Sequence, residues 1–301
     1  MKLPIISVPI VEIQLINSVR LFIKREDLIH PEISGNKFWK LFYNINQYLE
    51  NSKLEKKIIT FGGAFSNHIF TVSAVGEIYK IPTLGIIRGE EVEEKWQENF
   101  TLRKAKEKGM DFRFVSRENY RDKEKLSKEL QKEFPDALII PEGGSNELAV
   151  RGIQHMLTNE TKEFDYLCCA VGTGGTLAGI SRYGTEKQKV LGFKVVEDLS
   201  LKKQIFNWSG KRNFELISAS FGSYGKITDE NIRFINDFQE KYGILLDPIY
   251  TGKMMQKLFE MIEENYFKSG TKILAFHTGG LQGIEGANEM LKKKNREEIR
   301  L

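Results

Sequence analysis

The feature that most constrains the fold of this chain is the alternation of short apolar runs with longer amphipathic stretches. The short runs are rich in Ile, Leu, Val and Phe, and the longer stretches carry apolar residues at helical spacing with Lys and Glu on the opposite face. Strands that alternate with amphipathic helices build a mostly parallel sheet. The pattern therefore predicts the α/β class.

The alternation also places the individual elements. We expect strands at 21–25, 57–61, 83–88, 111–115, 137–141, 166–171, 190–195 and 272–277, and helices at 36–50, 66–79, 91–108, 117–134 and 229–242. No repeat, low-complexity tract or Pro-rich linker divides the chain. A second domain must therefore be inserted into the first.

Composition excludes several classes of protein. The 301 residues include 45 basic and 41 acidic ones, interleaved along the chain, which disfavours a nucleic-acid module. The start MKLPIISVPIVEI does not resemble a signal peptide, and no apolar run reaches membrane-spanning length. The adjacent Cys168 and Cys169 point to opposite faces of a strand, as buried thiols rather than a disulfide. We expect a soluble cytoplasmic protein that binds neither nucleic acid nor membrane, and no metal site.

Glycine clusters follow several of the expected strands. In an open α/β sheet, ligands bind beyond the carboxyl ends of the strands, where the backbone must approach the ligand closely. Several clusters in one chain favour a single polar ligand ringed by loops, although each glycine alone could serve an ordinary turn or helix cap. The clusters are SGNK at 34–37, FGG at 61–63, EGGSN at 142–146, GTGGT at 172–176 and HTGG at 277–280.

The cluster at 172–176 is typical of an anion site. In CCAVGTGGTLAGI an apolar strand enters the glycines and an apolar helix follows, so that free amides converge on an anion at the positive end of the helix. The segment has neither the Gly-Lys-Ser/Thr of a Walker loop nor the complete Rossmann glycine pattern. The remaining interpretation is a site that binds a phosphate group without a nucleotide.

Lys37 is the candidate nucleophile. It follows Gly35 and Asn36 at the start of an amphipathic stretch with Trp39 and Phe42. Partial desolvation at such a position lowers the pKa of the amine and frees it for Schiff-base chemistry. Most lysines of this chain are solvent-facing, so the indication depends on the phosphate loop.

Ordered motifs across nearly the whole chain resemble one enzyme family. KRED with SGNK, GGAFSNH, PEGGSN, GTGGT, DPIYTGK and HTGG are similar, in this order, to the pyridoxal-phosphate (PLP) enzymes of the tryptophan synthase β-like fold. The group that contains D-cysteine desulfhydrase and 1-aminocyclopropane-1-carboxylate deaminase is the most similar. The resemblance implies two doubly wound, mostly parallel-sheet domains with the cofactor in the cleft between them. Residues 1–50 and 145–301 would form the large PLP-binding domain and 51–144 the small inserted one.

The resemblance also implies roles for the cofactor-binding residues. Lys37 would bond to the cofactor aldehyde, and Asn67 would hydrogen-bond the ring hydroxyl. Thr251 would face the pyridine nitrogen. The phosphate would lie on the turn formed by Gly172, Thr173, Gly174, Gly175 and Thr176.

The same resemblance assigns the substrate side of the site. Ser66, Asn67 and His68 would stand at a helix start above the cofactor, with Ser66 as the N-cap and also in a catalytic role, and a substrate carboxylate could rest on their amides. His68 could instead be a structural histidine at that terminus. Tyr224 and Tyr250 match the two tyrosines that this group presents to the substrate, although Tyr224 could also lie in an ordinary surface turn.

Three positions separate the two activities of the group. Thr251 stands where the deaminases have the glutamate of YEGK, Thr278 where they have the leucine of HLGG, and His68 where they have the glutamine of SNQ. A neutral hydroxyl beside the pyridine nitrogen makes the ring a weaker electron sink, which favours substrates with a good leaving group on Cβ.

The resemblance therefore implies a lyase. The expected reaction is α,β-elimination from a small amino acid, with D-cysteine yielding pyruvate, hydrogen sulfide and ammonia. Alternatives are deamination of 1-aminocyclopropane-1-carboxylate, elimination from D-serine, its O-acyl derivatives or β-chloroalanine, and a PLP-binding protein without catalysis. The family also implies a homodimer.

Overall fold

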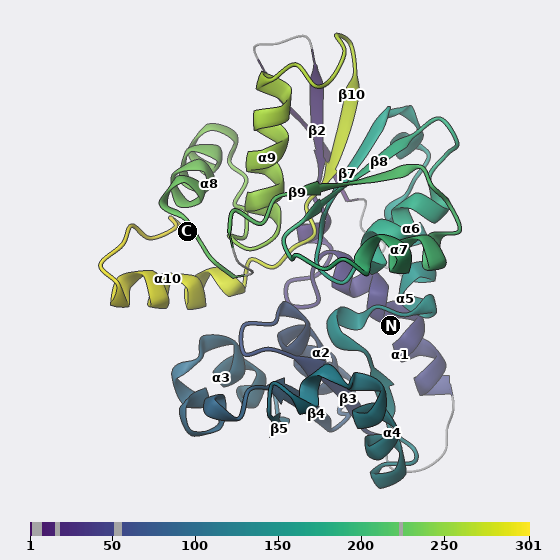
Figure 1. Ribbon diagram of the computed structural model, residues 1–301, viewed down its shortest axis with the longest axis vertical. Helices are drawn as coiled ribbons and strands as arrows, with labels where there is room; N and C mark the ends of the chain where they lie inside the picture. The colour runs from purple at the N-terminus through teal and green to yellow at the C-terminus, as the bar shows by residue number, and fades with distance from the viewer. Residues whose placement is uncertain (2–7, 16–18, 51–55, 223–224) are drawn as a thin grey trace.

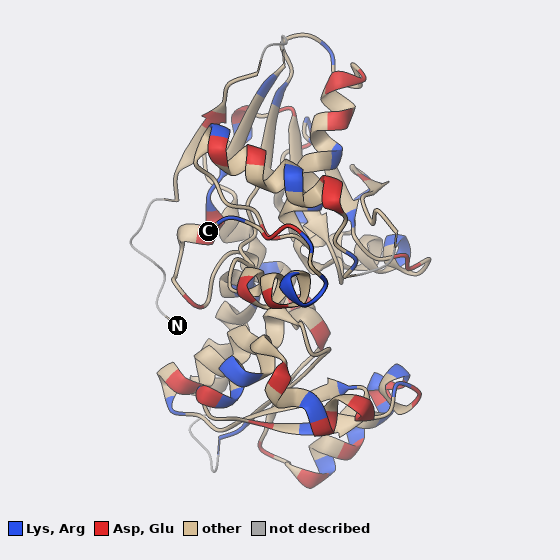
Figure 2. Cartoon of the chain, turned by 90° about the vertical axis from the view of Figure 1, so that its left-hand side faces the viewer, with Lys and Arg blue, Asp and Glu red and all other residues tan. Residues whose placement is uncertain are grey.

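Two parallel-dominated sheets, one above the other in Figure 1, organise the chain. The computed structural model describes residues 1, 8–15, 19–50, 56–222 and 225–301. The expected α/β class is confirmed. Figure 2 shows acidic and basic residues interspersed over the molecule, and none of the described helices is long and apolar enough to cross a membrane.

The upper sheet has six strands in the order β1-β2-β10-β7-β8-β9. All neighbours are parallel except β1 and β2. In Figure 1 the purple β2 lies beside the yellow β10, so strands from the two ends of the chain meet in the middle of the sheet. The strands are β1 (Ile10–Ile13), β2 (Arg20–Lys24), β7 (Tyr166–Val171), β8 (Lys189–Lys194), β9 (Phe214–Ser218) and β10 (Lys272–Phe276).

The lower sheet has four parallel strands in the order β5-β4-β3-β6. The strands are β3 (Ile58–Gly62), β4 (Thr83–Arg88), β5 (Met110–Val115) and β6 (Leu138–Ile140). β3 is buried along its whole length because it lies between two neighbours, with helices packed against the sheet. The domain boundaries at 51 and 144 stay a prediction.

Helices cover both faces of the upper sheet. α6 packs against β7 and β8 from one side and α9 from the other. Cys169 accordingly belongs to the apolar cluster shared with α6 and Cys168 to the one shared with α9, and both are buried free thiols, as expected. The helices are α1 (Asn36–Glu50), α2 (Asn67–Tyr79), α3 (Phe100–Glu107), α4 (Lys123–Glu133), α5 (Glu147–Gly152), α6 (Gly175–Tyr183), α7 (Leu201–Ser209), α8 (Asp229–Tyr242), α9 (Thr251–Glu263) and α10 (Gly283–Lys293).

The structure corrects two of the expected helices. The stretch 91–108 is not one helix: a 3-10 helix at Glu90–Glu98 ends at Asn99, whose side chain accepts a hydrogen bond from the Leu102 amide and begins α3. The stretch 117–134 is likewise divided by Asp122, which caps α4 through the Lys125 amide. Asparagine and aspartate make helix starts inside a continuous amphipathic pattern.

Candidate active site

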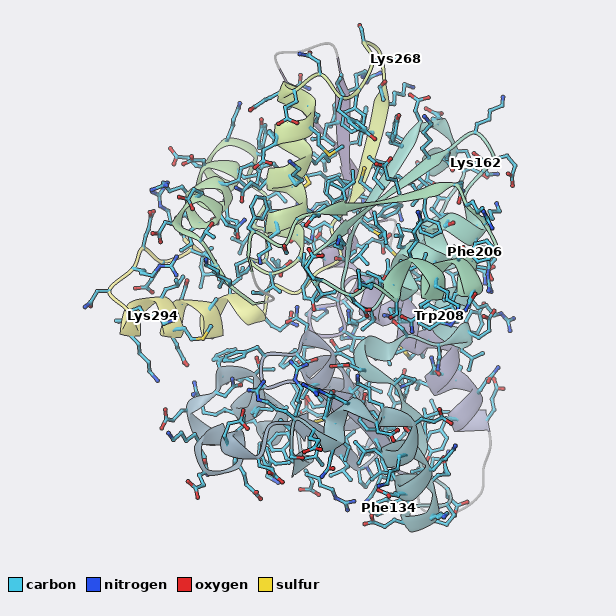
Figure 3. The ribbon with its side chains drawn as sticks, viewed as in Figure 1. Phe134, Lys162, Phe206, Trp208, Lys268 and Lys294 are labelled. Carbon is cyan, nitrogen blue, oxygen red and sulfur yellow. The ribbon has the colours of Figure 1, made fainter. Side chains whose placement is uncertain are left out.

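A cavity of about 850 Å³ lies between the two sheets, lined by residues from the ends of both. Such positions, beyond the carboxyl ends of parallel strands, are where α/β proteins bind ligands. In Figure 3, Trp208 of α7, one of the lining residues, is labelled near the level at which the two sheets face each other. The cavity brings together most of the predicted site residues, namely Lys37, Ser66, Asn67, His68, Gly172, Thr173, Gly174, Gly175, Thr176, Tyr250 and Thr278.

Lys37 opens onto this cavity from the first turn of α1. Its side chain keeps some contact with the cavity, yet the surrounding protein lowers the pKa of the amine from the usual 10.5 to about 8, because burial disfavours the charged form more than Asp247 favours it. Lys37 Nζ donates to Asn36 Oδ1 at 3.2 Å, and Asn36 Nδ2 donates to Thr176 Oγ1 at 2.8 Å. Hydrogen bonds therefore connect the amine to the glycine turn.

A buried frame, made by Lys24, Glu26, Gly35 and Trp39, fixes the start of α1. The carboxylate of Glu26 accepts hydrogen bonds from Lys24 Nζ at 2.5 Å and from Trp39 Nε1 at 2.8 Å. Its carbonyl accepts the Gly35 amide at 3.0 Å. Gly35 has a φ of +62°, and a Cβ there would lie 2.0 Å from the Thr278 carbonyl oxygen, so only glycine fits. Glu26 thus holds the chain on both sides of Lys37.

The turn at 172–176 forms an anion cradle at the start of α6. Gly174 has a φ of +82° and caps the helix without a side-chain hydrogen bond, which leaves the first amides of α6 to a ligand. A Cβ on Gly175 would lie 2.7 Å from Ser145 Oγ. Ser145 Oγ in turn lies 2.5 Å from Thr173 Oγ1. The cradle has hydroxyl groups at its side and no room for further side chains.

Lys40 adds a second amine to this end of the cavity. It stands one helical turn after Lys37, is 2% exposed, and donates to Ser145 Oγ at 2.7 Å and to the Gly143 carbonyl. Burial, followed by the nearby Lys37, lowers the pKa of Lys40 well below its usual value. An anion on the cradle would offset the cost of burying this charge. The sequence prediction missed Lys40, although its helical spacing from Lys37 puts both on one face.

The start of α2 forms the opposite side of the cavity. Ser66 is the N-cap, as predicted, and its hydroxyl accepts from the Ile69 amide. The side chain of Asn67 faces the loop after β10, since a Cβ on Gly280 would lie 2.7 Å from Asn67 Nδ2. Asn67 makes no side-chain hydrogen bond to any residue that the structure describes, so its amide is available to a ligand.

His68 is held as a neutral ring. It is 1% exposed, and its Nε2 lies 2.8 Å from the hydroxyl of Thr60, which itself donates to the Ile140 carbonyl. The Thr60 oxygen therefore accepts from His68, and Nδ1 carries a lone pair. Burial, together with the nearby Lys37 and Lys40, lowers the pKa of His68 well below its usual value. The neutral ring, with its one hydrogen engaged, fits a structural role for the side chain. Binding of a substrate carboxylate by the backbone amide of His68 stays a prediction.

The loop before α9 corrects the prediction for Thr251. This residue is fully buried and does not line the cavity: its hydroxyl donates to Asp247 Oδ1 at 2.7 Å and accepts the Asp247 amide at 3.0 Å. The carboxylate that faces the cavity belongs to Asp247, which also accepts the amides of Ile249, Tyr250 and Thr251. Asp247 is the first residue of the motif DPIYTGK and was not predicted as a site residue, although aspartate before a helix start is a capping signal.

The structure describes one of the two predicted tyrosines, Tyr250. The ring of Tyr250 lies against the first residue of the glycine turn, since a Cβ on Gly172 would come within 3.2 Å of Tyr250 Cε1. Tyr250 therefore lies beside the anion cradle and lines the cavity. Tyr224 lies outside the described residues.

The described residues fit a PLP molecule. They supply a buried amine of lowered pKa, free helix amides beside a second buried amine for a phosphate, and the open amide group of Asn67 for a ring hydroxyl. This donor set suits a ligand that is both a carbonyl compound and a phosphate ester.

Comparison with protein families and named relatives agrees with this donor set. The family described as "Pyridoxal-phosphate dependent enzyme" matches residues 2–279. A protein of Pyrococcus horikoshii, provisionally named 1-aminocyclopropane-1-carboxylate deaminase, is 32% identical over 87% of this chain and 85% of its own length. The mitochondrial bifunctional D-cysteine desulfhydrase/1-aminocyclopropane-1-carboxylate deaminase of Arabidopsis thaliana is 30% identical over 89% of this chain and 74% of its own.

Solved structures share the fold. The crystal structure of a homologue of 1-aminocyclopropane-1-carboxylate deaminase superimposes with a TM-score of 0.79 at 29% identity, over 97% of this chain and 95% of that one. The O-acetylserine dependent cystathionine β-synthase of Helicobacter pylori has a TM-score of 0.69 at 17% identity, over 99% and 97% of the two chains, which shows a common fold alone.

Proposed function

Because the chain belongs to the family of pyridoxal-phosphate dependent enzymes, we propose that it catalyses α,β-elimination from a small amino acid, with D-cysteine as the substrate and pyruvate, hydrogen sulfide and ammonia as the products. The observation that carries the proposal is the hydrogen-bonded connection from Lys37 through Asn36 to Thr176. It puts an amine of lowered pKa beside an anion cradle, as elimination with a PLP cofactor requires.

The cofactor supplies an electron sink that stabilises negative charge at the substrate Cα when it is bound. The amine of Lys37, once the substrate amine has displaced it, takes the proton from Cα as a general base. With a pKa near 8 this amine exchanges its proton close to neutral pH. Lys40 and the first amides of α6 would hold the phosphate, and Asn67 the ring hydroxyl.

The remaining residues would orient the substrate. The amides at the start of α2 would receive the α-carboxylate, with Ser66 and Asn67 at that turn and Thr278 in the opposite wall. Tyr250, and Tyr224 by the family resemblance, would present their hydroxyl groups to the substrate.

Two features support D-cysteine over the cyclopropane acid. Position 251 carries no carboxylate, and the hydroxyl of Thr251 is engaged by Asp247. The Asp247 carboxylate already accepts several donors of its own loop, so it is poorly suited to keep a pyridine nitrogen protonated. A weak electron sink favours loss of a thiolate from Cβ over opening of a ring that has no leaving group.

A substrate panel tests the choice. We expect the PLP-loaded enzyme to release a 2-oxo acid from D-cysteine at least about tenfold faster than from L-cysteine or from 1-aminocyclopropane-1-carboxylate, as a difference of about 1.4 kcal/mol in the barrier gives. Deamination of the cyclopropane acid is the second candidate, favoured by the names of the relatives. Faster release from that acid would establish it and overturn the first.

The cofactor assignment has a separate test. Lys37→Ala should remove the yellow absorbance that the bound cofactor brings and lower the rate by about a thousandfold or more, since it deletes the general base as well as the attachment point. Lys253→Ala offers a comparison, because Lys253 is also buried but donates to the Ser220 carbonyl. An unchanged spectrum in Lys37→Ala would refute the assignment.

We also propose a homodimer, by family resemblance alone, and a cytoplasmic location, which the two buried free thiols favour. Light scattering of the purified protein should give twice the mass of the 34.7 kDa chain.

A further inference from the structure

Arg88 is a cation of the cavity wall. It is the last residue of β4, at the carboxyl edge of the lower sheet, and its partly buried side chain lines the cavity. Among the described residues, no hydrogen-bond acceptor or carboxylate pairs with its guanidinium. An arginine so placed is suited to bind an anion that enters with the ligand.

The neighbouring cations of the same wall are already paired. Arg117 lies 2.5 Å from Glu91, and Lys123 lies 3.0 Å from Glu142. Their side chains are also 67% and 42% exposed, so water screens them further. Arg88 therefore differs from Arg117 and Lys123 in having its charge available to a ligand.

The position of the guanidinium is defined by two contacts. Its Cζ lies 5.7 Å from the ring centroid of Tyr120, which is 2% exposed and therefore rigidly placed. A Cβ on Gly63 would lie 3.4 Å from Arg88 Nη2. Gly63 belongs to the turn between β3 and α2 whose later amides would receive the α-carboxylate. The guanidinium therefore lies next to the first residue of that turn.

The size of the cavity also bears on the substrate. Its volume of about 850 Å³ lies toward the upper end of the range for sites that hold a drug-sized ligand, so a substrate side chain larger than that of cysteine can be accommodated. We propose that Arg88 recognises a second acidic group on the substrate side chain, so that the enzyme accepts acidic amino acids as well as small neutral ones. This inference rests on the proposed function, because it assumes an amino acid in this cavity.

Binding of two ligands of equal shape and different charge tests the inference. We expect aspartate to bind the PLP-loaded enzyme about tenfold more tightly than asparagine, measured by isothermal titration with both enantiomers of each. Arg88→Met should abolish this ratio by weakening aspartate alone, and Arg88→Lys should restore part of it, because the charge returns without the planar fork. The matched control Arg117→Met should keep the ratio within twofold of the wild type.

Two outcomes would overturn the inference. One is a wild-type enzyme that binds asparagine as tightly as aspartate. The other is an Arg88→Met enzyme that weakens both ligands equally, since Arg88 would then hold the α-carboxylate. The yellow absorbance of each variant shows that it is folded and loaded. The binding measurement needs no turnover. Inactivity toward D-cysteine would therefore refute the proposed reaction, whereas the ratio of aspartate to asparagine binding would still test the role of Arg88.

Discussion

The two walls of the cavity are held in different ways. Beneath Lys37, the frame centred on Glu26 is a buried ion pair, with the side chains of Lys24 and Glu26 only 3% and 0% exposed. Across the cavity, the ion pairs of the lower sheet are more exposed, and that of Arg117 and Glu91 has side chains 67% and 56% exposed. A low dielectric strengthens the first kind of pair, whereas water and salt weaken the second.

The difference separates chemistry from recognition. The wall that carries Lys37, the proposed reacting amine, tolerates little movement, because Glu26 fixes the chain both before and after it. On the wall that carries Arg88, charged surface residues can be substituted at a small cost in the free energy of unfolding. Substrate preference should therefore change through the lower sheet more easily than through the upper one.

The largest expected effect is on the buried frame. Glu26→Gln leaves the Lys24 ammonium buried without a counter-charge, and we expect the free energy of unfolding to fall by about 3 kcal/mol, as when one partner of a buried pair is removed. Urea unfolding monitored by circular dichroism measures this. The double variant Lys24→Met, Glu26→Gln should recover at least half of the lost free energy of unfolding. A loss below about 1 kcal/mol in Glu26→Gln would show that the two walls do not differ in this way.

The second prediction concerns the pH dependence of cofactor uptake on the rigid wall. The pKa of Lys37 is lowered to about 8, so the neutral amine that reacts with the cofactor gains population as the pH rises toward that value. The rate of PLP uptake by the apoprotein should rise about tenfold per pH unit below 8 and level off above it, as followed by stopped-flow absorbance. A plateau that begins only near 10 would mean that burial does not act on this amine.

The same shift acts on stability with a defined sign. Because the folded pKa lies below the usual 10.5, the unfolded chain binds a proton between about 8 and 10.5 that the folded chain has released. Titration of Lys37 therefore increases the free energy of unfolding of the apoprotein as the pH rises through that window. Lys37→Met, which cannot titrate, should lack this contribution.

The smallest expected effect is on the lower sheet. Arg113 and Glu133 form an ion pair with side chains 42% and 47% exposed. Glu133→Gln should lower the free energy of unfolding by about 0.5 kcal/mol, and 0.5 M salt should remove most of the difference. A loss comparable to that of Glu26→Gln, by the same urea experiment, would show that exposure does not distinguish the two walls.

The elements that sequence predicts well are those whose local pattern matches their final environment. The strand at Tyr166–Val171 and the helices at Asn36–Glu50 and Asp229–Tyr242 have the predicted bounds, because continuous burial or a clear apolar face is written in the residues themselves. β1 and β9 were missed. Both lie at sheet edges with mostly exposed or partly exposed residues, so their strand conformation depends on the neighbouring strand.

The site follows the same rule. Ser66 at a helix start and the glycine turn at 172–176 follow local signals, and the structure places both at the cavity. That Asp247 and not Thr251 lines the cavity depends on how one loop folds back on itself. The contact of Glu26 with Trp39 joins residues across the start of α1, and only the folded chain brings them together.

The pairing of β2 with β10 has a consequence for how the protein is made. β2 stands near the beginning of the chain and β10 near its end, so the upper sheet cannot close until the ribosome has released almost the whole polypeptide. The lower sheet uses one continuous stretch and can fold during synthesis. In the nascent protein, the wall that carries Arg88 should therefore fold well before the upper sheet is complete and a cofactor can bind.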